Sequence, residues 1–264
     1  MQNRRAIVVA AFGDRRKQVQ RLVKNIRSYS DLPIHIITTK DSEIGISCCE
    51  KFRDGIQTYY THYVERQWPK GSYREGVRNS NYHKINSALE HHYHSLCMLD
   101  DDMYIANPNF IGGFVIAECF GAALPLNPRV YNYVNLMGAD VRDDDVNEMA
   151  LLKIPPSMPA VNFSPFFVYP HAGYTTNFLH ALRIELRNVP CRGTVAIIKA
   201  MWNSKFTPVI LPEQWCVCGS NAQHIKDYTK MFRGKRINIK PIMLHLGHDE
   251  VRKVFADEIG GGLK

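Results

Sequence analysis

Three consecutive aspartates, Asp100, Asp101 and Asp102, are the residues of this chain best suited to chemistry, because they end an apolar run over 96–99. An apolar run of this length between polar residues predicts a buried strand. The carboxyl end of such a strand is where open α/β sheets bind their ligands. Three adjacent carboxylates repel one another and are costly to desolvate without a cation. The stretch therefore predicts a site for a divalent metal, with substrate phosphates as further ligands.

The spacing of these aspartates predicts more than one role. Alternation along a strand end places Asp100 and Asp102 on one side of the chain and Asp101 on the other. Asp100 and Asp102 can therefore face one metal-bound ligand, and we assign Asp101 to catalysis beside them. The alternative is a solvated acidic turn, which the apolar flanks on both sides disfavour.

Two distant segments supply groups that could complete this site. Lys84 precedes the aspartates near the start of a helix predicted over 82–93. A lysine there is unfavourable to the helix dipole, so a phosphate or ribose is expected to hold it; an ordinary exposed lysine is the alternative. His245 lies late in an apolar strand predicted over 237–246, where an imidazole can be the third metal ligand. A hydrogen-bonded core histidine is the alternative there, and His248 is a second candidate ligand.

The N-terminal third predicts the start of a parallel α/β sheet. Apolar residues 6–12 and 33–39 form two strands, and apolar spacing within 14–29 predicts the helix between them. The first turn lacks the GxGxxG pattern of dinucleotide sites. We assign donor contacts to the two strand ends and to a polar loop over 61–80, namely Phe12, Gly13, Asp41 and Arg78.

Other elements alternate along the remaining chain. Apolar runs and helical spacing predict strands over 56–60 and 161–169 and helices over 175–188 and 194–202. Residues 125–159 form a proline-rich excursion rather than a linker, because apolar elements resume on both sides. The sequence therefore predicts one domain.

The composition is that of a soluble globular protein. The chain has 264 residues, 45% of them hydrophobic, and no stretch approaches the length of a transmembrane helix. The apolar N-terminal segment reads as a first strand rather than a signal peptide. Seven scattered cysteines without a C-x-x-C pair predict reduced thiols, a cytoplasmic location and no zinc site. A formal net charge of +8 favours an anionic partner.

Residues 81–105 resemble the lysine-helix-LDxD block of GT-A nucleotide-sugar glycosyltransferases, especially the glycogenin-like group. The opening strand and the late Leu244-His245-Leu246-Gly247 resemble the same family. The resemblance implies an α/β, GT-A type fold with a Rossmann-like, mostly parallel sheet flanked by helices in a single domain, 1–264. Within it, 1–106 would bind the nucleotide sugar and 107–264 the acceptor. The resemblance further implies Mn²⁺ or Mg²⁺ bound by Asp100, Asp102 and His245, with Lys84 and Asp100 on the donor.

The implied reaction moves a sugar from a nucleoside diphosphate sugar, UDP-linked in our interpretation, to a hydroxyl acceptor. Arg252 and Lys253 could hold the diphosphate. Inversion at the anomeric carbon would need a side-chain base, for which Glu213 is our candidate, and Asn162 and His171 are further acceptor-side groups.

The acceptor and the class of function stay open at this point. The acceptor is a glycan or lipid-linked glycan, with peripheral membrane contact, or a hydroxylated base in DNA, whose backbone would attract the positive charge. Three carboxylates and a histidine also suit a metal-dependent nucleotidyltransferase or phosphohydrolase. A basic DNA-binding module is the non-enzymatic alternative.

Overall fold

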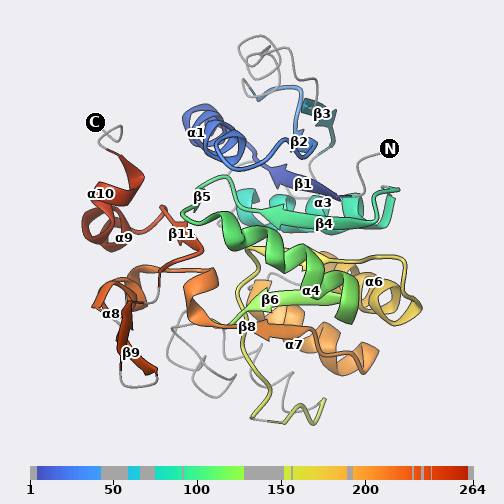
Figure 1. Ribbon diagram of the computed structural model, residues 1–264. Helices are drawn as coiled ribbons and strands as arrows, with labels where there is room; N and C mark the ends of the chain where they lie inside the picture. Colours follow the sequence, from blue (N-terminus) through green and yellow to red (C-terminus); the bar gives the residue numbers. More distant parts are fainter. Residues whose placement is uncertain are drawn as a thin grey trace.

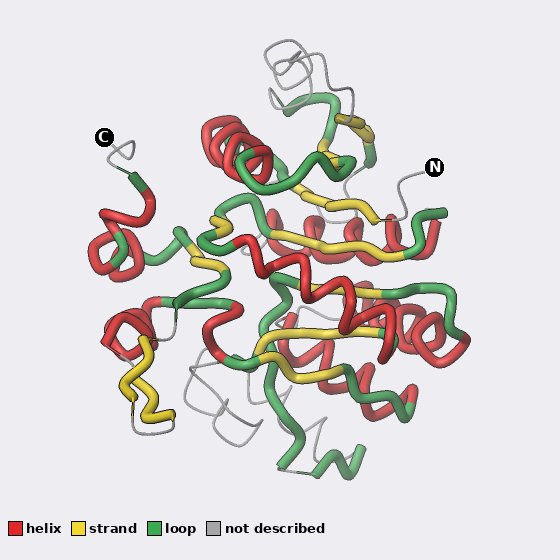
Figure 2. Tube along the Cα trace, in the orientation of Figure 1, coloured by secondary structure: helices red, strands yellow, loops and turns green. Residues whose placement is uncertain are grey.

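The computed structural model describes residues 5–42, 59–65, 75–90, 92–127, 152–155, 157–188, 193–227, 229–232, 235–238 and 240–260. A central seven-stranded sheet has the order β3-β2-β1-β4-β7-β6-β8. Helices cover both faces of this sheet (Figure 1; Figure 2). The strands are β1 (Arg5–Ala10), β2 (Ile34–Thr38), β3 (Tyr59–Tyr63), β4 (Ser95–Leu99), β6 (Ala122–Pro125), β7 (Phe166–Val168) and β8 (Val209–Leu211).

The sheet is mostly parallel. β3, β2, β1 and β4 pair in parallel, as do β6 and β8. β7 is antiparallel to both of its neighbours, β4 and β6, so it is the one reversed strand among these seven. The predicted single-domain α/β class with a mostly parallel sheet is confirmed.

The sheet lies between two apolar layers because its central strands are buried on both faces. In β1, Val8 packs in the same cluster as Ile85 of α3 (Glu75–Glu90), whereas Val9 packs with Val23 of α1 (Arg16–Arg27). α6 (Gly173–Asn188) and α7 (Gly193–Ser204) lie on the α3 side, and α4 (Gly112–Phe120) lies on the α1 side. A strand buried on both faces needs a continuous apolar run, which is what the sequence shows.

Smaller elements extend the carboxyl edge of the sheet. β5 (Met103–Ile105) pairs antiparallel with β11 (Met243–His245), and β9 (Thr229–Phe232) pairs with β10 (Lys235–Asn238). A third apolar cluster packs beneath β11 and α9. The short helices are η1 (Pro108–Ile111), η3 (Glu213–Trp215), η4 (Gly219–Asn221), α8 (Ala222–Asp227), α9 (Asp249–Val254) and α10 (Ala256–Ile259).

Several predicted boundaries were wrong. α3 begins at Glu75, well before the predicted 82–93, because its first turns carry polar residues that gave no apolar periodicity. The strand predicted over 237–246 is two strands, separated around Pro241, which cannot donate to a ladder. The strand predicted over 56–60 lies at 59–63.

Some sequence predictions stay predictions. Most of 125–159 lies outside the described residues, and the division of the domain at residue 106 is not tested. Among the described helices, none combines the length and apolarity needed to cross a bilayer.

Candidate active site

The pairing of β5 with β11 brings His245 beside the aspartates. The chain leaves β4 at Leu99, turns through the three aspartates and enters β5, whose Met103 is in register with His245. The Leu246 amide donates to the Asp102 carbonyl at 2.8 Å. A short antiparallel ladder therefore joins two segments that are far apart in the sequence.

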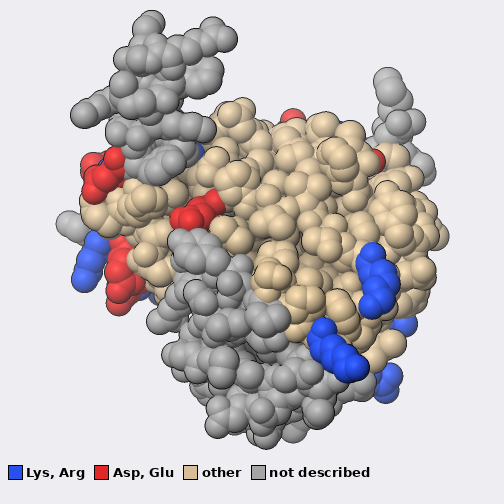
Figure 3. Space-filling model, turned by 90° about the horizontal axis from the view of Figure 1, so that it is seen from below, with Lys and Arg blue, Asp and Glu red and all other residues tan. Residues whose placement is uncertain are grey.

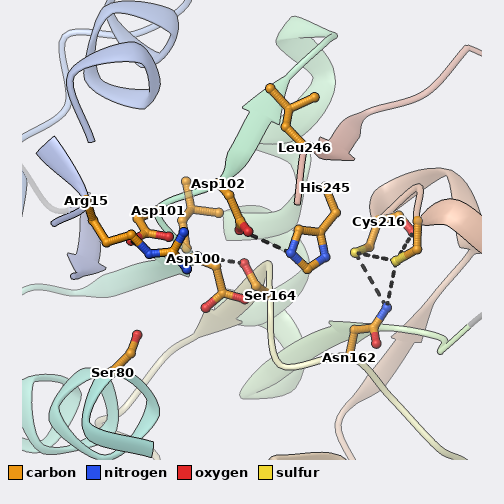
Figure 4. A network of polar contacts seen from close by, with 12 residues as sticks. Arg15, Ser80, Asp100, Asp101, Asp102, Asn162, Ser164, Cys216, His245 and Leu246 are labelled. Carbon is orange, nitrogen blue, oxygen red and sulfur yellow. Dashed lines mark hydrogen bonds and ion pairs between the residues drawn. The ribbon is translucent and has the colours of Figure 1, made fainter. Parts of the chain in front are cut away.

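Asp100, Asp102 and His245 each present one ligand atom, and these three atoms lie within 4.8 Å of one another. The His245 Nε2 is 3.1 Å from the Asp102 Oδ1 (Figure 4). That Oδ1 is buried, and the ion pair with His245 is the contact that the structure gives it among the described residues. Two carboxylates and an imidazole that converge in this way fit a divalent cation such as Mn²⁺ or Mg²⁺.

The charges at this cluster compensate one another in the absence of a metal. Burial raises the pKa of Asp102, but contact with His245 outweighs burial and lowers that pKa to about 2. Burial likewise lowers the pKa of His245, yet contacts with Asp102 and Cys218 raise it well above its usual value. Without a metal, both shifts favour an imidazolium–carboxylate pair, so a cation that binds here would compete with the imidazole proton.

Lys84 lies against Asp100 and is completely buried. Its Nζ donates to the Asp100 carboxylate, lies 3.5 Å from the Leu99 carbonyl and sits 5.2 Å from the centre of the Phe163 ring. Lys84 is in the middle of α3, so the expectation of a lysine near a helix N-terminus was wrong. The ion pair with Asp100, rather than the helix dipole, is what holds this ammonium group in place.

Asp101 points away from the other two aspartates and toward Arg15 (Figure 4). The distance from its Oδ2 to the Arg15 Nε is 3.4 Å. Burial raises the pKa of Asp101 to about 6, although Arg15 opposes that shift. Asp101 therefore lies outside the three-residue cluster, and its assignment to catalysis stays a prediction.

A cavity of about 600 Å³ opens beside the cluster. Asp100 and His245 line it together with three side-chain amides, two hydroxyls and the carboxylate of Glu250. Its described lining residues are Asn81, Asp100, Asn127, Asn162, Phe163, Gly193, Thr194, Cys218, Gly219, Ser220, His245, His248 and Glu250. A cavity of this size, with amide, hydroxyl and carboxylate side chains in its lining and a candidate cation site beside it, suits a hydroxyl-rich ligand.

The other predicted donor contacts lie at neighbouring strand ends. Phe12 and Gly13 follow β1, and the exposed Asp41 follows β2, so all three are at the same sheet edge as the aspartates. None is among the described lining residues of the cavity. Gly13 has a φ of 79°, a backbone conformation that favours glycine. Arg78 lies in α3, and the structure describes its backbone only.

The structure separates the C-terminal basic residues and Glu213 from the cavity. Arg252 donates to the Leu246 carbonyl and to the Asp249 carboxylate, so its guanidinium is held by its own chain, and Lys253 is exposed. Glu213 accepts from the Asn221 Nδ2 at 3.3 Å and is not among the described lining residues. Besides Asp100, the carboxylate among the described lining residues is Glu250, which our sequence analysis missed.

A second group of potential metal ligands shares His245. Cys216, Cys218 and His245 offer ligand atoms within 4.8 Å of one another, although the scattered cysteines in the sequence predicted no zinc site. Contact with Cys216 chiefly, and with His245 and His248, lowers the pKa of Cys218 well below its usual value. A C-x-C pair with a distant histidine has no short-range sequence signature, which is why the sequence did not reveal this group.

The comparisons with known proteins place the fold. No family model and no curated protein matches the sequence. The fold is that of several solved glycosyltransferases. The galactosyltransferase LgtC, in complex with donor and acceptor sugar analogues, superposes with a TM-score of 0.63 and 10% identity over 98% of this chain and 96% of LgtC.

Two longer glycosyltransferases share the same fold. The bifunctional glycosyltransferase WbbM gives a TM-score of 0.64 and 12% identity over 98% of this chain and 50% of WbbM. GlyE of Streptococcus pneumoniae TIGR4 gives 0.57 and 13% identity over 97% of this chain and 60% of GlyE. The chain thus spans about half the length of WbbM and nearly all of LgtC, and it has a glycosyltransferase fold.

Proposed function

We propose that this protein is a metal-dependent glycosyltransferase that moves a sugar from a nucleoside diphosphate sugar, UDP-linked, to a hydroxyl acceptor. The observation that carries the proposal is the meeting of Asp100, Asp102 and His245 beside a cavity of about 600 Å³. The shared fold with LgtC, which was solved with donor and acceptor sugar analogues, supports it.

The roles of the chain's own residues follow from their placement. Asp100, Asp102 and His245 would hold Mn²⁺ or Mg²⁺, which when bound neutralises the negative charge that develops on a diphosphate leaving group. Lys84 holds the Asp100 carboxylate in position from the buried side. Because His245 is paired with Asp102, its imidazole is oriented before the cation arrives.

The cavity beyond these ligands is suited to the sugar and the acceptor. Asn81, Asn162 and Thr194 offer donors and acceptors for sugar hydroxyls. An acceptor hydroxyl that attacks the anomeric carbon with inversion needs a base within reach. We place Glu250 in that role because it lines the cavity, and keep Glu213 as the second candidate.

A glycan or lipid-linked glycan is the acceptor class that we propose, in the cytoplasm. The acceptor sugar analogue in the LgtC structure supports this class. On the face shown in Figure 3, the described Lys and Arg side chains lie mostly toward one side of the molecule. A hydroxylated DNA base, whose neighbouring phosphates a basic surface would attract, is the second acceptor to be tested.

The test is hydrolysis of a panel of UDP-, GDP- and CDP-sugars, with Mn²⁺ or with a chelator. We expect slow release of free sugar and nucleoside diphosphate from UDP-sugars only, abolished by the chelator. Asp102→Asn should lower this rate by about 100-fold or more, because a metal ligand and the partner of His245 are both lost.

The matched control is Asp257→Asn, an exposed residue of α10 that should retain wild-type activity. Release of orthophosphate or pyrophosphate would instead identify a phosphohydrolase or nucleotidyltransferase. Donor turnover that is equal in the chelator and in Mn²⁺ would contradict the proposed metal dependence.

A further inference from the structure

The structure brings two thiols to the far side of the same imidazole. Cys216 follows η3 and Cys218 precedes η4. In Figure 4 the His245 ring lies between Asp102 and Cys216. The His245 Nε2 is turned toward Asp102, so the thiols meet the opposite side of the ring. His245 therefore faces oxygen ligands on one side and sulfur ligands on the other.

The backbone fixes this arrangement. The Val217 amide donates to the Met243 carbonyl at 3.0 Å, and the His245 amide donates to the Val217 carbonyl at 2.9 Å. Alternation along this extended segment turns Cys216 and Cys218 to one side, while Val217 packs into the apolar cluster beneath β11. The two thiols and the imidazole thus sit on two paired segments, as a preformed ligand set requires.

The spacing of the sulfur atoms matches a tetrahedral metal. Zinc binds thiolate sulfur at about 2.3 Å, so two sulfurs at a tetrahedral angle lie about 3.8 Å apart. The Cys216 Sγ and the Cys218 Sγ are 3.7 Å apart. No rearrangement of these two side chains is needed to place one zinc ion between them.

The surroundings of the thiols also suit metal-bound thiolates. The Asn162 Nδ2 lies 3.5 Å from the Cys216 Sγ and 3.6 Å from the Cys218 Sγ, so one amide donates to both sulfurs (Figure 4). Amide donors to ligand atoms are the usual outer contacts of a metal site. Cys218 and His245 line the cavity, which gives an ion a path of entry.

We propose that Cys216, Cys218 and His245 form a second metal site, selective for Zn²⁺ over Mn²⁺ and Mg²⁺, with its fourth position open to the cavity. Thiolate ligands favour Zn²⁺, whereas carboxylates favour Mg²⁺ and Mn²⁺. Because a neutral imidazole has only one unprotonated nitrogen to offer a metal, Zn²⁺ at the thiols opposes Mn²⁺ at Asp100 and Asp102. This opposition rests on the proposed function, whereas Zn²⁺ binding does not.

The first experiment titrates the reduced, chelator-treated full chain with Co²⁺ and with Zn²⁺. Co²⁺ should give an intense near-ultraviolet sulfur-to-metal charge-transfer band, and one equivalent of Zn²⁺ should abolish it. Cys216→Ser and Cys218→Ser should each remove the band and weaken Zn²⁺ binding by about 100-fold. Cys119→Ser, an exposed free cysteine of α4, is the matched control and should bind as wild type.

The remaining ligands separate the two sites. Asp102→Asn should keep Zn²⁺ binding but lose Mn²⁺ binding, measured by the electron paramagnetic resonance of free Mn²⁺, whereas His245→Gln should lose both. In the wild type, Zn²⁺ should release bound Mn²⁺. Absence of Mn²⁺ binding in the wild type, with Zn²⁺ bound normally, would contradict the proposed function and leave the zinc site intact.

A measurement on the unmodified chain guards against variants that fail to fold. Zn²⁺ should protect Cys216 and Cys218, but not Cys119, from alkylation by a maleimide, as read by peptide mass spectrometry. Equal labelling of all three with and without Zn²⁺, or Zn²⁺ affinity unchanged in both serine variants, would overturn the zinc site.

Discussion

Each of the three adjacent aspartates has a different cationic partner. Asp100 is paired with Lys84, Asp101 with Arg15 and Asp102 with His245. Three neighbouring carboxylates are therefore compensated separately before any metal binds. The partner of each carboxylate fits its proposed role. Asp102 is paired with the third proposed metal ligand, Asp100 is held by a fully buried ammonium group, and Asp101 is directed away from both.

Asp101→Asn is expected to stabilise the metal-free protein at alkaline pH. The folded pKa of Asp101, about 6, is above the reference value of 3.8, so its ionised form is disfavoured by folding. The protonated Asp101 side chain therefore stabilises the folded state fully below pH 3.8, and this contribution to the free energy of unfolding is lost as the pH rises through 6. The advantage of the variant should therefore grow by about 1–1.5 kcal/mol between pH 5 and pH 8.

The measurement is urea unfolding of both proteins in a chelator across that pH range. Asp257→Asn, which replaces an exposed aspartate, serves as the control and should show no such growth. A constant difference between Asp101→Asn and the wild type from pH 5 to pH 8 would contradict the raised pKa.

At the scale of elements, the position of the site depends on the short strand β5. The Asn25 Nδ2 of α1 donates to the Ile105 carbonyl at 3.0 Å, and the Ile105 amide donates to the Asn25 Oδ1 at 2.6 Å. The buried Asn25 side chain thus makes both backbone hydrogen bonds that a neighbouring strand would make with Ile105 on this edge of β5. The turn of aspartates is fixed between this contact and the end of β4.

Asn25→Ala should lower the free energy of unfolding by about 2–4 kcal/mol, because two buried backbone groups lose their partners. Donor turnover should fall as well, since β5 positions the turn that carries Asp102. Thermal unfolding and the hydrolysis assay measure the two effects. Asn109→Ala, in an exposed position of η1, is the control and should change stability by less than about 0.5 kcal/mol.

Gly247 gives a second prediction at this scale, because the backbone after β11 approaches the cluster closely. A Cβ at this position would lie 2.5 Å from the Asp102 Oδ2 and 3.3 Å from the His245 Nε2. Gly247→Ala should therefore displace two of the proposed metal ligands and weaken Mn²⁺ binding by about 10-fold or more.

The comparison variant is Gly173→Ala, at a position where a Cβ meets nothing within 4 Å. Isothermal titration with Mn²⁺ measures the effect for both. Wild-type Mn²⁺ affinity in Gly247→Ala would show that the cation does not lie between Asp102 and His245.

For the whole molecule, the metal and nucleotide are expected to act as stabilising ligands. Mn²⁺ with UDP at about 100 times the dissociation constant should add about 2.7 kcal/mol to the free energy of unfolding. For a chain of this size that corresponds to a rise in Tm of about 5–10 °C. Differential scanning fluorimetry with Mn²⁺ and UDP, followed by a chelator, measures the rise and its reversal.

A comparison of UDP with GDP and CDP tests whether this stabilisation is specific for the uracil nucleotide. GDP and CDP with Mn²⁺ should stabilise less than UDP, and UDP in the chelator should stabilise least. Equal shifts for all three nucleotides would contradict the UDP preference, and no shift with any of them would contradict the nucleotide site.

The sequence by itself determined the class of fold and the acidic centre. Continuous apolar runs such as 6–12 and 96–99, bounded by polar residues, indicate strands buried on both faces, and the charged turn after β4 then falls at a sheet edge. These signals are local, because hydrophobic periodicity and the desolvation of charge act within a few residues along the chain.

Only the tertiary structure decided which distant groups meet at that edge. The β5–β11 ladder brings His245 to Asp102, the interior of α3 delivers Lys84 to Asp100, and the segment at Val217 brings two thiols to the same imidazole. Each of these contacts depends on long-range pairing and packing, which leave no periodic trace in the sequence. For the same reason the sequence did not predict that Glu250 lines the cavity, and it proposed Glu213, which is not among the described lining residues.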